Sequence, residues 1–252
     1  MRKKVFIFGD SCTADIAGAQ IPDAADIMER KPGIKMKGYK RIFIDDLDFT
    51  FFWGIGTPAA GTYKTPNYFE SIVNELPNKI DEESLVFLYY GGIDIERQFF
   101  EDNNAQLVVD NYFKHTQDFF KKFTSNIFYI EVSPLAEVTH GALKKMLLDI
   151  PNEQRIKNWM DFTVKLKIKC LENNILEPFS IGLETFGSLT RITGVHTPDG
   201  YHFYRDQSEL IRLDLAKWIK KNKKTFAKTP KETWLSLKNN GPYDEDLYLY
   251  DI

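Results

Sequence analysis

The stretch that decides the fold is VFIFGDS, residues 5–11. Its first four residues are all apolar, and a continuous apolar run of this length is typical of a parallel strand covered on both faces. Gly9 permits a tight turn, which leaves the Ser11 hydroxyl at the carboxyl end of the strand, the edge where open α/β sheets bind ligands. The same residues also fit a simpler interpretation, in which Ser11 only caps a following helix.

Four further apolar runs of strand length follow, at residues 48–53, 85–90, 127–132 and 175–179. Segments of helical period separate them, and a last helix follows near residues 206–219, opening with Asp206 and Glu209 at capping-box-like spacing. The helix before 175–179 is expected to bury one face, made of Ile156, Trp159, Met160, Thr163, Leu166 and Cys170. Residues 15–40 are less periodic and are expected as a long excursion. Alternation of strands and helices predicts right-handed crossovers and a doubly wound, parallel, five-stranded sheet.

A second polar motif lies just ahead of the last helix, where residues 197–203 read TPDGYHF. Asp199 and His202 are three residues apart and can supply the acid–base part of a serine triad. The imidazole would take the serine proton, and the carboxylate would orient the ring. His196, six residues upstream in the same loop, is the competing base. A surface loop whose histidine caps a helix is the simpler alternative.

Two glycine-bearing loops lie between these motifs, each after an expected strand. Gly54 and Gly56 follow the second strand, and residues 91–94, GGID, follow the third. Loops at these strand ends face Ser11 in a doubly wound sheet, and their backbone N–H groups could stabilise an oxyanion. For each glycine alone, an ordinary turn residue is the favoured interpretation.

Together the motifs resemble the four blocks of the SGNH, or GDSL-like, hydrolase superfamily. Residues 9–11 match the nucleophile block, Gly54 or Gly56 the glycine block, residues 91–94 the third block, and residues 199–202 the Asp-x-x-His block. The resemblance extends from residue 5 to about residue 222. It implies a three-layer α/β/α sandwich with a flavodoxin-like strand order.

The resemblance also implies roles for individual residues. Ser11 would be the nucleophile, His202 the base and Asp199 its orienting carboxylate. The backbone N–H groups of Ser11 and Gly54 would bind the oxyanion, with Gly56 as the alternative to Gly54.

The third block departs from the family pattern. The family usually has Gly-x-Asn-Asp, whose Asn side chain donates to the oxyanion, whereas this chain has Ile93 at that position. Loss of one oxyanion donor typically costs about 10²–10³ in rate. Around the nucleophile, Asp10, Gly92, Ile93 and Asp94 are the expected substrate contacts. The motif GGID is similar to the GEID of branches that resemble polysaccharide-modifying proteins, which favours a glycan ester.

These observations predict a serine ester hydrolase, with a carbohydrate O-acetyl ester as the favoured substrate. Two alternatives remain open. An acyltransferase could use the same triad, with a sugar hydroxyl in place of water. The missing asparagine also fits a catalytically silent domain that binds a glycan or a partner protein.

Composition limits the remaining possibilities. The 252 residues carry a net charge of −3, which does not favour nucleic acid or an anionic membrane as a partner. We expect no cofactor and no metal, because the chain has neither a phosphate loop nor a metal-type motif. Neither a signal peptide nor a membrane span is recognisable, which predicts a cytoplasmic protein. The oligomeric state is open.

The domain organisation is expected to be simple. One hydrolase-like domain covers residues 1–225, and residues 226–252 form a C-terminal extension. This extension ends in the acidic, tyrosine-rich sequence YDEDLYLYDI.

Overall fold

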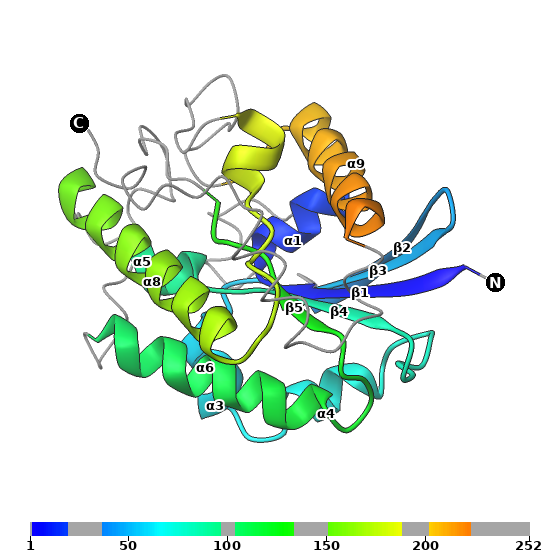
Figure 1. Ribbon diagram of the computed structural model, residues 1–252, viewed down its shortest axis with the longest axis horizontal. Helices are drawn as coiled ribbons and strands as arrows, with labels where there is room; N and C mark the ends of the chain where they lie inside the picture. Colours follow the sequence, from blue (N-terminus) through cyan, green and yellow to red (C-terminus); the bar gives the residue numbers. More distant parts are fainter. Residues whose placement is uncertain (1, 20–36, 97–103, 134–150, 188–201, 223–252) are drawn as a thin grey trace, which may run out of the picture.

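A five-stranded sheet in the order β2-β3-β1-β4-β5 forms the centre of the molecule (Figure 1). The computed structural model describes residues 2–19, 37–96, 104–133, 151–187 and 202–222. The strands are β1 (Lys3–Gly9), β2 (Lys37–Ile44), β3 (Leu47–Gly54), β4 (Leu85–Tyr89) and β5 (Ile127–Tyr129). β1 pairs in parallel with β3 and β4, and β4 pairs in parallel with β5. The predicted doubly wound sheet with a flavodoxin-like order of its parallel strands is therefore confirmed.

The fifth strand is not where the sequence predicted it. Residues 175–179 make only one bridge to the sheet, between Ile130 and Phe179. Phe179 directs both its N–H and its carbonyl towards this side, to Tyr129 and Glu131, so the missing N–H of Pro178 falls on the open edge, where strands tolerate proline. The fifth strand is instead β2, which pairs antiparallel with β3 at the opposite edge. Its start falls within the expected excursion, so the prediction of a purely parallel sheet was wrong at this edge.

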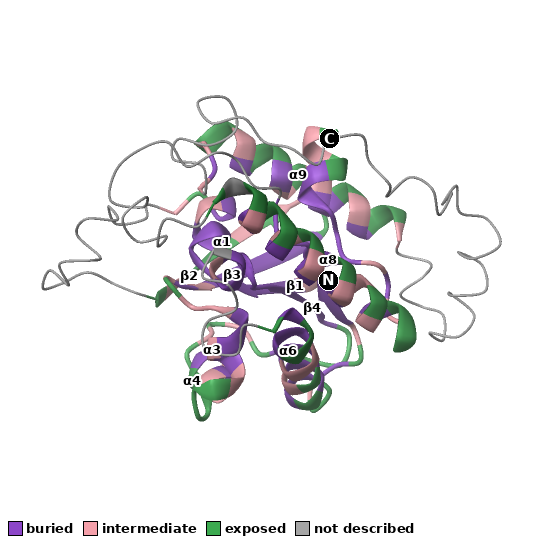
Figure 2. Ribbon diagram, turned by 90° about the vertical axis from the view of Figure 1, so that its left-hand side faces the viewer, coloured by how far each residue is buried: buried purple, intermediate pink, exposed green. Residues whose placement is uncertain are grey.

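Helices cover both faces of the sheet and complete three layers, as predicted (Figures 1 and 2). One face packs against α3 (Ala59–Lys64), α4 (Tyr68–Val73), α6 (Ala105–Phe120) and α8 (Asn152–Glu172). The other face packs against α1 (Ser11–Ile16), the short π-helix η2 (Gly182–Phe186) and α9 (Arg205–Lys221). α5 (Gly92–Glu96) begins shortly after β4.

Two details of the helices differ from the sequence interpretation. Ile156 and Met160 of α8 are 41% and 38% exposed, whereas Phe162, Leu166 and Cys170 form its buried face. α9 begins after Tyr204 without a side-chain cap. The expected extension at residues 226–252 lies outside the described residues.

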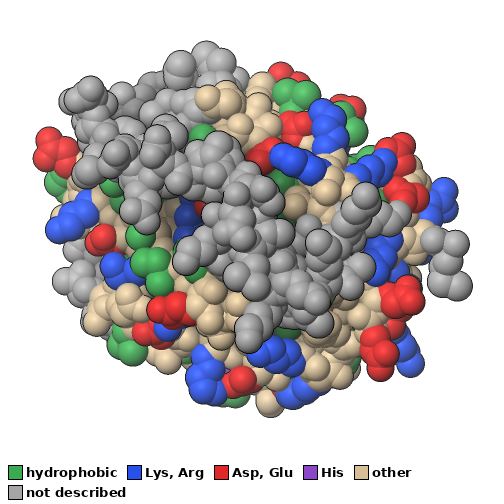
Figure 3. Space-filling model, viewed as in Figure 1, with side chains coloured by type: hydrophobic (Ala, Val, Ile, Leu, Met, Phe, Trp, Pro, Cys, Tyr) green, Lys and Arg blue, Asp and Glu red, His purple; other side chains and the backbone are tan. Residues whose placement is uncertain are grey.

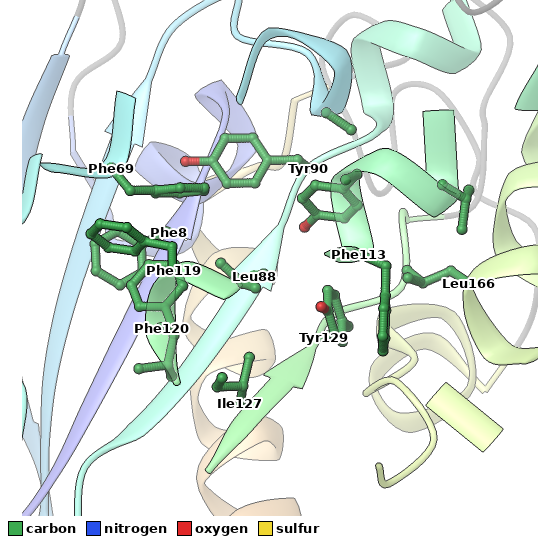
Figure 4. Packing of buried hydrophobic residues seen from close by; sticks show 14 of the residues in the cluster. Phe8, Phe69, Leu88, Tyr90, Phe113, Phe119, Phe120, Ile127, Tyr129 and Leu166 are labelled. Carbon is green, nitrogen blue, oxygen red and sulfur yellow. The ribbon is translucent and has the colours of Figure 1, made fainter. Parts of the chain in front are cut away.

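Aromatic side chains fill the layer between the sheet and α4 and α6 (Figure 4). Phe8 of β1 lies at the centre, with its ring centroid 5.0 Å from Phe120, 6.2 Å from Phe52 and 6.3 Å from Phe69. Each aromatic side chain of this size buries about 150–250 Å². The strand that ends in the GDS motif is thus fixed by ring packing.

A buried carboxylate joins the chain segments that follow β3 and β4. Asp94 of α5 is fully buried, and its two oxygens accept from the backbone N–H groups of Ala59 (2.6 Å) and Ala60 (3.1 Å). Burial raises the pKa of Asp94 to about 7, although the two N–H donors oppose the rise. The negative charge of Asp10 raises the pKa of Asp94 further. Asp94 therefore ties the first turn of α3 to α5.

Truncation of Phe8 should be costly. We expect Phe8→Ala to lower the free energy of unfolding by about 3–5 kcal/mol, because a fully buried ring leaves a cavity behind. Phe43→Ala is the matched control, since Phe43 is 51% exposed on β2. It should cost about 1 kcal/mol or less. Chemical denaturation of both variants measures the difference, and equal costs would contradict the packing described here.

Asp94 should make the protein less stable as the pH rises. Its folded pKa of about 7 exceeds the ordinary value of 3.8, so between these values the folded protein keeps a proton that the unfolded chain has released. The contribution of Asp94 is therefore full below about pH 4 and is lost as the pH rises towards 7. Asp94→Asn should remove this decline from the curve of unfolding free energy against pH.

Asp118→Asn is the control for this measurement. Lys114 holds the pKa of the Asp118 carboxyl below its usual value, so that group titrates at more acidic pH. Its replacement should leave the slope between about pH 4.5 and 7 unchanged. An unchanged slope in Asp94→Asn would show that Asp94 does not titrate in this range.

Candidate active site

Ser11 is the first residue of α1 and follows the end of β1 after the single residue Asp10. The carboxylate of Asp10 caps the helix by accepting from the Cys12 N–H at 3.0 Å. Helix geometry gives the Ser11 N–H no partner inside α1, because it is the first of the four orphan donors at a helix start. Local geometry therefore sets both the Ser11 hydroxyl and its N–H group at the carboxyl edge of the sheet.

His202 meets Ser11 across 191 positions of sequence, with its Nε2 atom 3.2 Å from the Ser11 Oγ atom. The next residue, Phe203, donates its backbone N–H to the Asp15 carboxylate of α1 at 3.2 Å. Arg212 of α9 donates to the Ile16 carbonyl at 2.6 Å. The segment that carries His202 is thus fastened to the helix that carries Ser11.

This pair has the geometry of a nucleophile and its general base, since an unliganded site needs a separation of about 2.6–3.2 Å or slightly more. Asp199, the expected orienting carboxylate, and His196, the competing base, lie outside the described residues. Ser11 is 4% exposed, so little of its surface reaches solvent.

Gly54 ends β3 at the same edge, and a tight turn follows it. The Thr57 N–H donates to the Gly54 carbonyl at 3.2 Å, and Gly56 has a φ of +72°. A positive φ at the third residue is what a type II turn requires, which explains glycine at position 56. Trp53 of β3 pairs with Gly9 of β1, so Gly54 lies one residue further along, beside the start of the GDS turn.

The expected substrate contacts occupy different environments. Gly92 and Ile93 begin α5, and Ile93 is partly buried against the core cluster on the α1 and α9 side of the sheet. Asp10 and Asp94 are 2% and 0% exposed. The Asp94 carboxylate is used by the backbone of α3, and that of Asp10 caps α1. These two carboxylates therefore serve the fold in this structure.

Sequence reasoning missed two hydroxyl groups beside Gly54, those of Thr57 and Tyr68, and a third that bonds one of them. Thr57 Oγ1 and Tyr68 Oη lie on the side of Gly54 from which a side chain would project, and the Tyr68 and Tyr90 oxygens lie 3.2 Å apart. No spacing in the sequence marks them, because Tyr68 comes from α4 and Tyr90 follows β4. The one available signal was that residue 90 extends a strand that ends at the site.

Other chemistry-bearing side chains lie elsewhere. Cys12 is buried, belongs to no disulfide and packs among apolar side chains. His115 of α6 stacks on Phe69, and burial lowers its pKa. Within the described residues, no cluster of histidine, cysteine and acidic side chains has the make-up of a metal site.

None of the helices in the described part of the chain combines the length and apolar character needed to cross a bilayer. On the face seen in Figure 3, the coloured basic and acidic side chains are intermingled.

Solved structures with the same fold belong to ester-cleaving families. A member of the lipolytic G-D-S-L family from Veillonella parvula is 13% identical, with 85% of this chain and 97% of that chain covered and a TM-score of 0.52. A carbohydrate acetylesterase family member from Sinorhizobium meliloti is 14% identical, with 86% and 97% covered and a TM-score of 0.56. No protein-family model and no curated protein matches the chain. At this level of identity the comparison establishes architecture, and the chain has the fold of the SGNH, or GDSL-like, hydrolases.

Proposed function

We propose that this protein is a serine ester hydrolase that works through an acyl-serine intermediate. The observation that carries the proposal is the 3.2 Å contact between His202 Nε2 and Ser11 Oγ, made by residues from opposite ends of the domain. A serine hydroxyl is a weak nucleophile until a neighbouring base accepts its proton. The cap on α1 and the Phe203–Asp15 hydrogen bond favour this role, because they hold the two groups without help from a substrate.

The reaction would proceed in two halves. Ser11 Oγ attacks the ester carbonyl carbon while His202 takes the hydroxyl proton, and the carbonyl π electrons move to the oxygen. The backbone N–H groups of Ser11 and Gly54 stabilise that oxygen, with Gly56 as the fallback. The carbonyl then re-forms, and the alcohol leaves with the proton from His202. In the second half, water attacks the acyl-serine carbonyl while His202 takes a proton from the water, and the acid leaves as Ser11 regains its proton from His202. Asp199 would orient the imidazole.

The favoured substrate class is an O-acetyl ester of a carbohydrate. Two observations support it: the GGID third block and the structural similarity to a carbohydrate acetylesterase family member. The partly buried Ile93 motivates one alternative, a catalytically silent binding domain, since this side chain has no donor. An acyltransferase would form the same acyl-serine and would differ only in the acceptor.

A fluorophosphonate probe should label Ser11. We expect His202→Ala to lose labelling, because the hydroxyl then loses the imidazole that contacts it, while the melting temperature stays near that of the native protein. Cys12→Ala is the matched control, since it alters the neighbouring buried side chain and should keep the label. Peptide mapping by mass spectrometry identifies the labelled residue. Labelling at Cys12, or none in the folded native protein, would refute the hydrolase proposal.

Ile93→Asn should raise kcat/KM on an activated acetyl ester, provided the new amide reaches the oxyanion. The physical reason is that one donor is typically worth about 10²–10³ in rate. The partial burial of Ile93 opposes the gain, because an unpaired buried amide costs about 1–3 kcal/mol of stability. Melting temperatures measured beside the kinetics separate the two effects. Equal rates at equal stability would place the oxyanion away from the third block.

A further inference from the structure

Hydroxyl groups crowd the side of Gly54 from which a side chain would project. A β carbon at that position would lie 2.7 Å from Thr57 Oγ1 and 3.1 Å from Tyr68 Oη. The Tyr68 oxygen therefore lies against the residue whose N–H is the proposed oxyanion donor. This close approach also explains why position 54 is glycine, since any larger residue would displace both hydroxyl groups.

The hydrogen bond between Tyr68 and Tyr90 allows the Tyr68 proton to point elsewhere. Tyr90 is 1% exposed, and its hydroxyl oxygen lies 3.2 Å from that of Tyr68, a pair in which either hydroxyl can donate. A phenolic oxygen can accept such a bond while its own O–H donates to another group. With Tyr90 as the donor, the Tyr68 O–H is directed to a different acceptor.

Tyr68 also keeps that proton at neutral pH. Burial raises its pKa above the ordinary value of 10, and the nearby negative charge of Asp10 adds to the rise. Asp10 acts in the same direction on Tyr90 and Asp94, so its carboxylate field extends across this end of the sheet. A second negative charge that develops in such a field needs strong hydrogen-bond donors to offset the repulsion.

We propose that Tyr68 donates a hydrogen bond to the substrate oxygen that becomes negative when Ser11 attacks, in the role that Ile93 cannot fill. The inference rests on the proposed ester hydrolysis. No proton leaves Tyr68: the Ser11 proton goes to His202, the carbonyl electron pair goes to the substrate oxygen, and Tyr68 stabilises that charge through its O–H. Tyr90 is a positioning residue, because its hydroxyl orients that of Tyr68.

Tyr68→Phe tests the proposal, because it removes the hydroxyl and keeps the ring that packs on Phe69 and Tyr90. We expect kcat on an activated acetyl ester to fall about 10²–10³-fold, with little change in KM. Affinity for a trifluoromethyl ketone, which forms a charged adduct with the serine, should fall by a similar factor. Tyr39→Phe, on the half-exposed Tyr39 of β2, is the matched control and should leave both quantities unchanged.

Two further variants sharpen the test. Tyr90→Phe should lower kcat less than Tyr68→Phe does, because Tyr68 keeps its proton but loses one of the groups that orient it. In the Tyr68→Phe background, Ile93→Asn should recover a larger factor in kcat than it adds to the native protein. An equal gain in both backgrounds would mean that the two side chains do not share one oxyanion.

The outcomes separate this inference from the proposed function. If the native protein neither turns over esters nor reacts at Ser11, the hydrolase proposal fails. If the native protein is active and Tyr68→Phe matches it in kcat and in ketone affinity, only the role of Tyr68 fails. Should Tyr68→Phe not fold, 3,5-difluorotyrosine at position 68 keeps the shape and makes the O–H more acidic. The alkaline limb of kcat/KM should then move to lower pH, and an unmoved limb would overturn the inference.

Discussion

The site depends on the close approach of Gly9 to its neighbours. A β carbon at Gly9 would lie 1.9 Å from Thr13 Oγ1 and 2.5 Å from the Tyr89 carbonyl oxygen. Because glycine has none, the chain passes from β1 to α1 through a single residue, Asp10. Ser11 therefore lies beside the end of β4, and not a turn further out. A backbone oxygen cannot move aside as a flexible side chain can, so this constraint is rigid.

Buried polar groups then connect the segments around Ser11. Asp94 holds the start of α3, Asp15 holds the backbone beside His202, and the Tyr68 hydroxyl beside Gly54 pairs with that of Tyr90. In each case a polar side chain is matched to a partner from another element. Buried polar groups are costly when unpaired, so these contacts specify one arrangement of the loops. The aromatic core below supplies most of the stability, and the polar layer supplies the geometry.

The sequence predicted those strands and helices whose apolar residues follow a regular pattern. It also predicted those site residues that belong to a short local motif. β1, β3 and β4 are continuous apolar runs, and Ser11 and His202 belong to short motifs at element ends. β2 was missed because it is covered on one side only and carries three basic residues, a pattern that is typical of a surface segment. The Tyr68–Tyr90 pair was missed because its residues come from different elements, and only folding brings them together. Ser11 and His202 are in contact, and the roles of these two residues, of Asp199 and of the third block stay predictions.

The antiparallel strand β2 has a consequence for the behaviour of the chain in concentrated solution. β3 is rich in phenylalanine and almost wholly buried, the kind of segment that templates intermolecular strand pairing when it lies at an open edge. β2 occupies that edge and presents Lys37, Lys40 and Arg41 beside it. Positive charge on an edge strand disfavours the approach of a second identical edge. The antiparallel strand β2 therefore protects the protein from aggregation through the phenylalanine-rich strand β3.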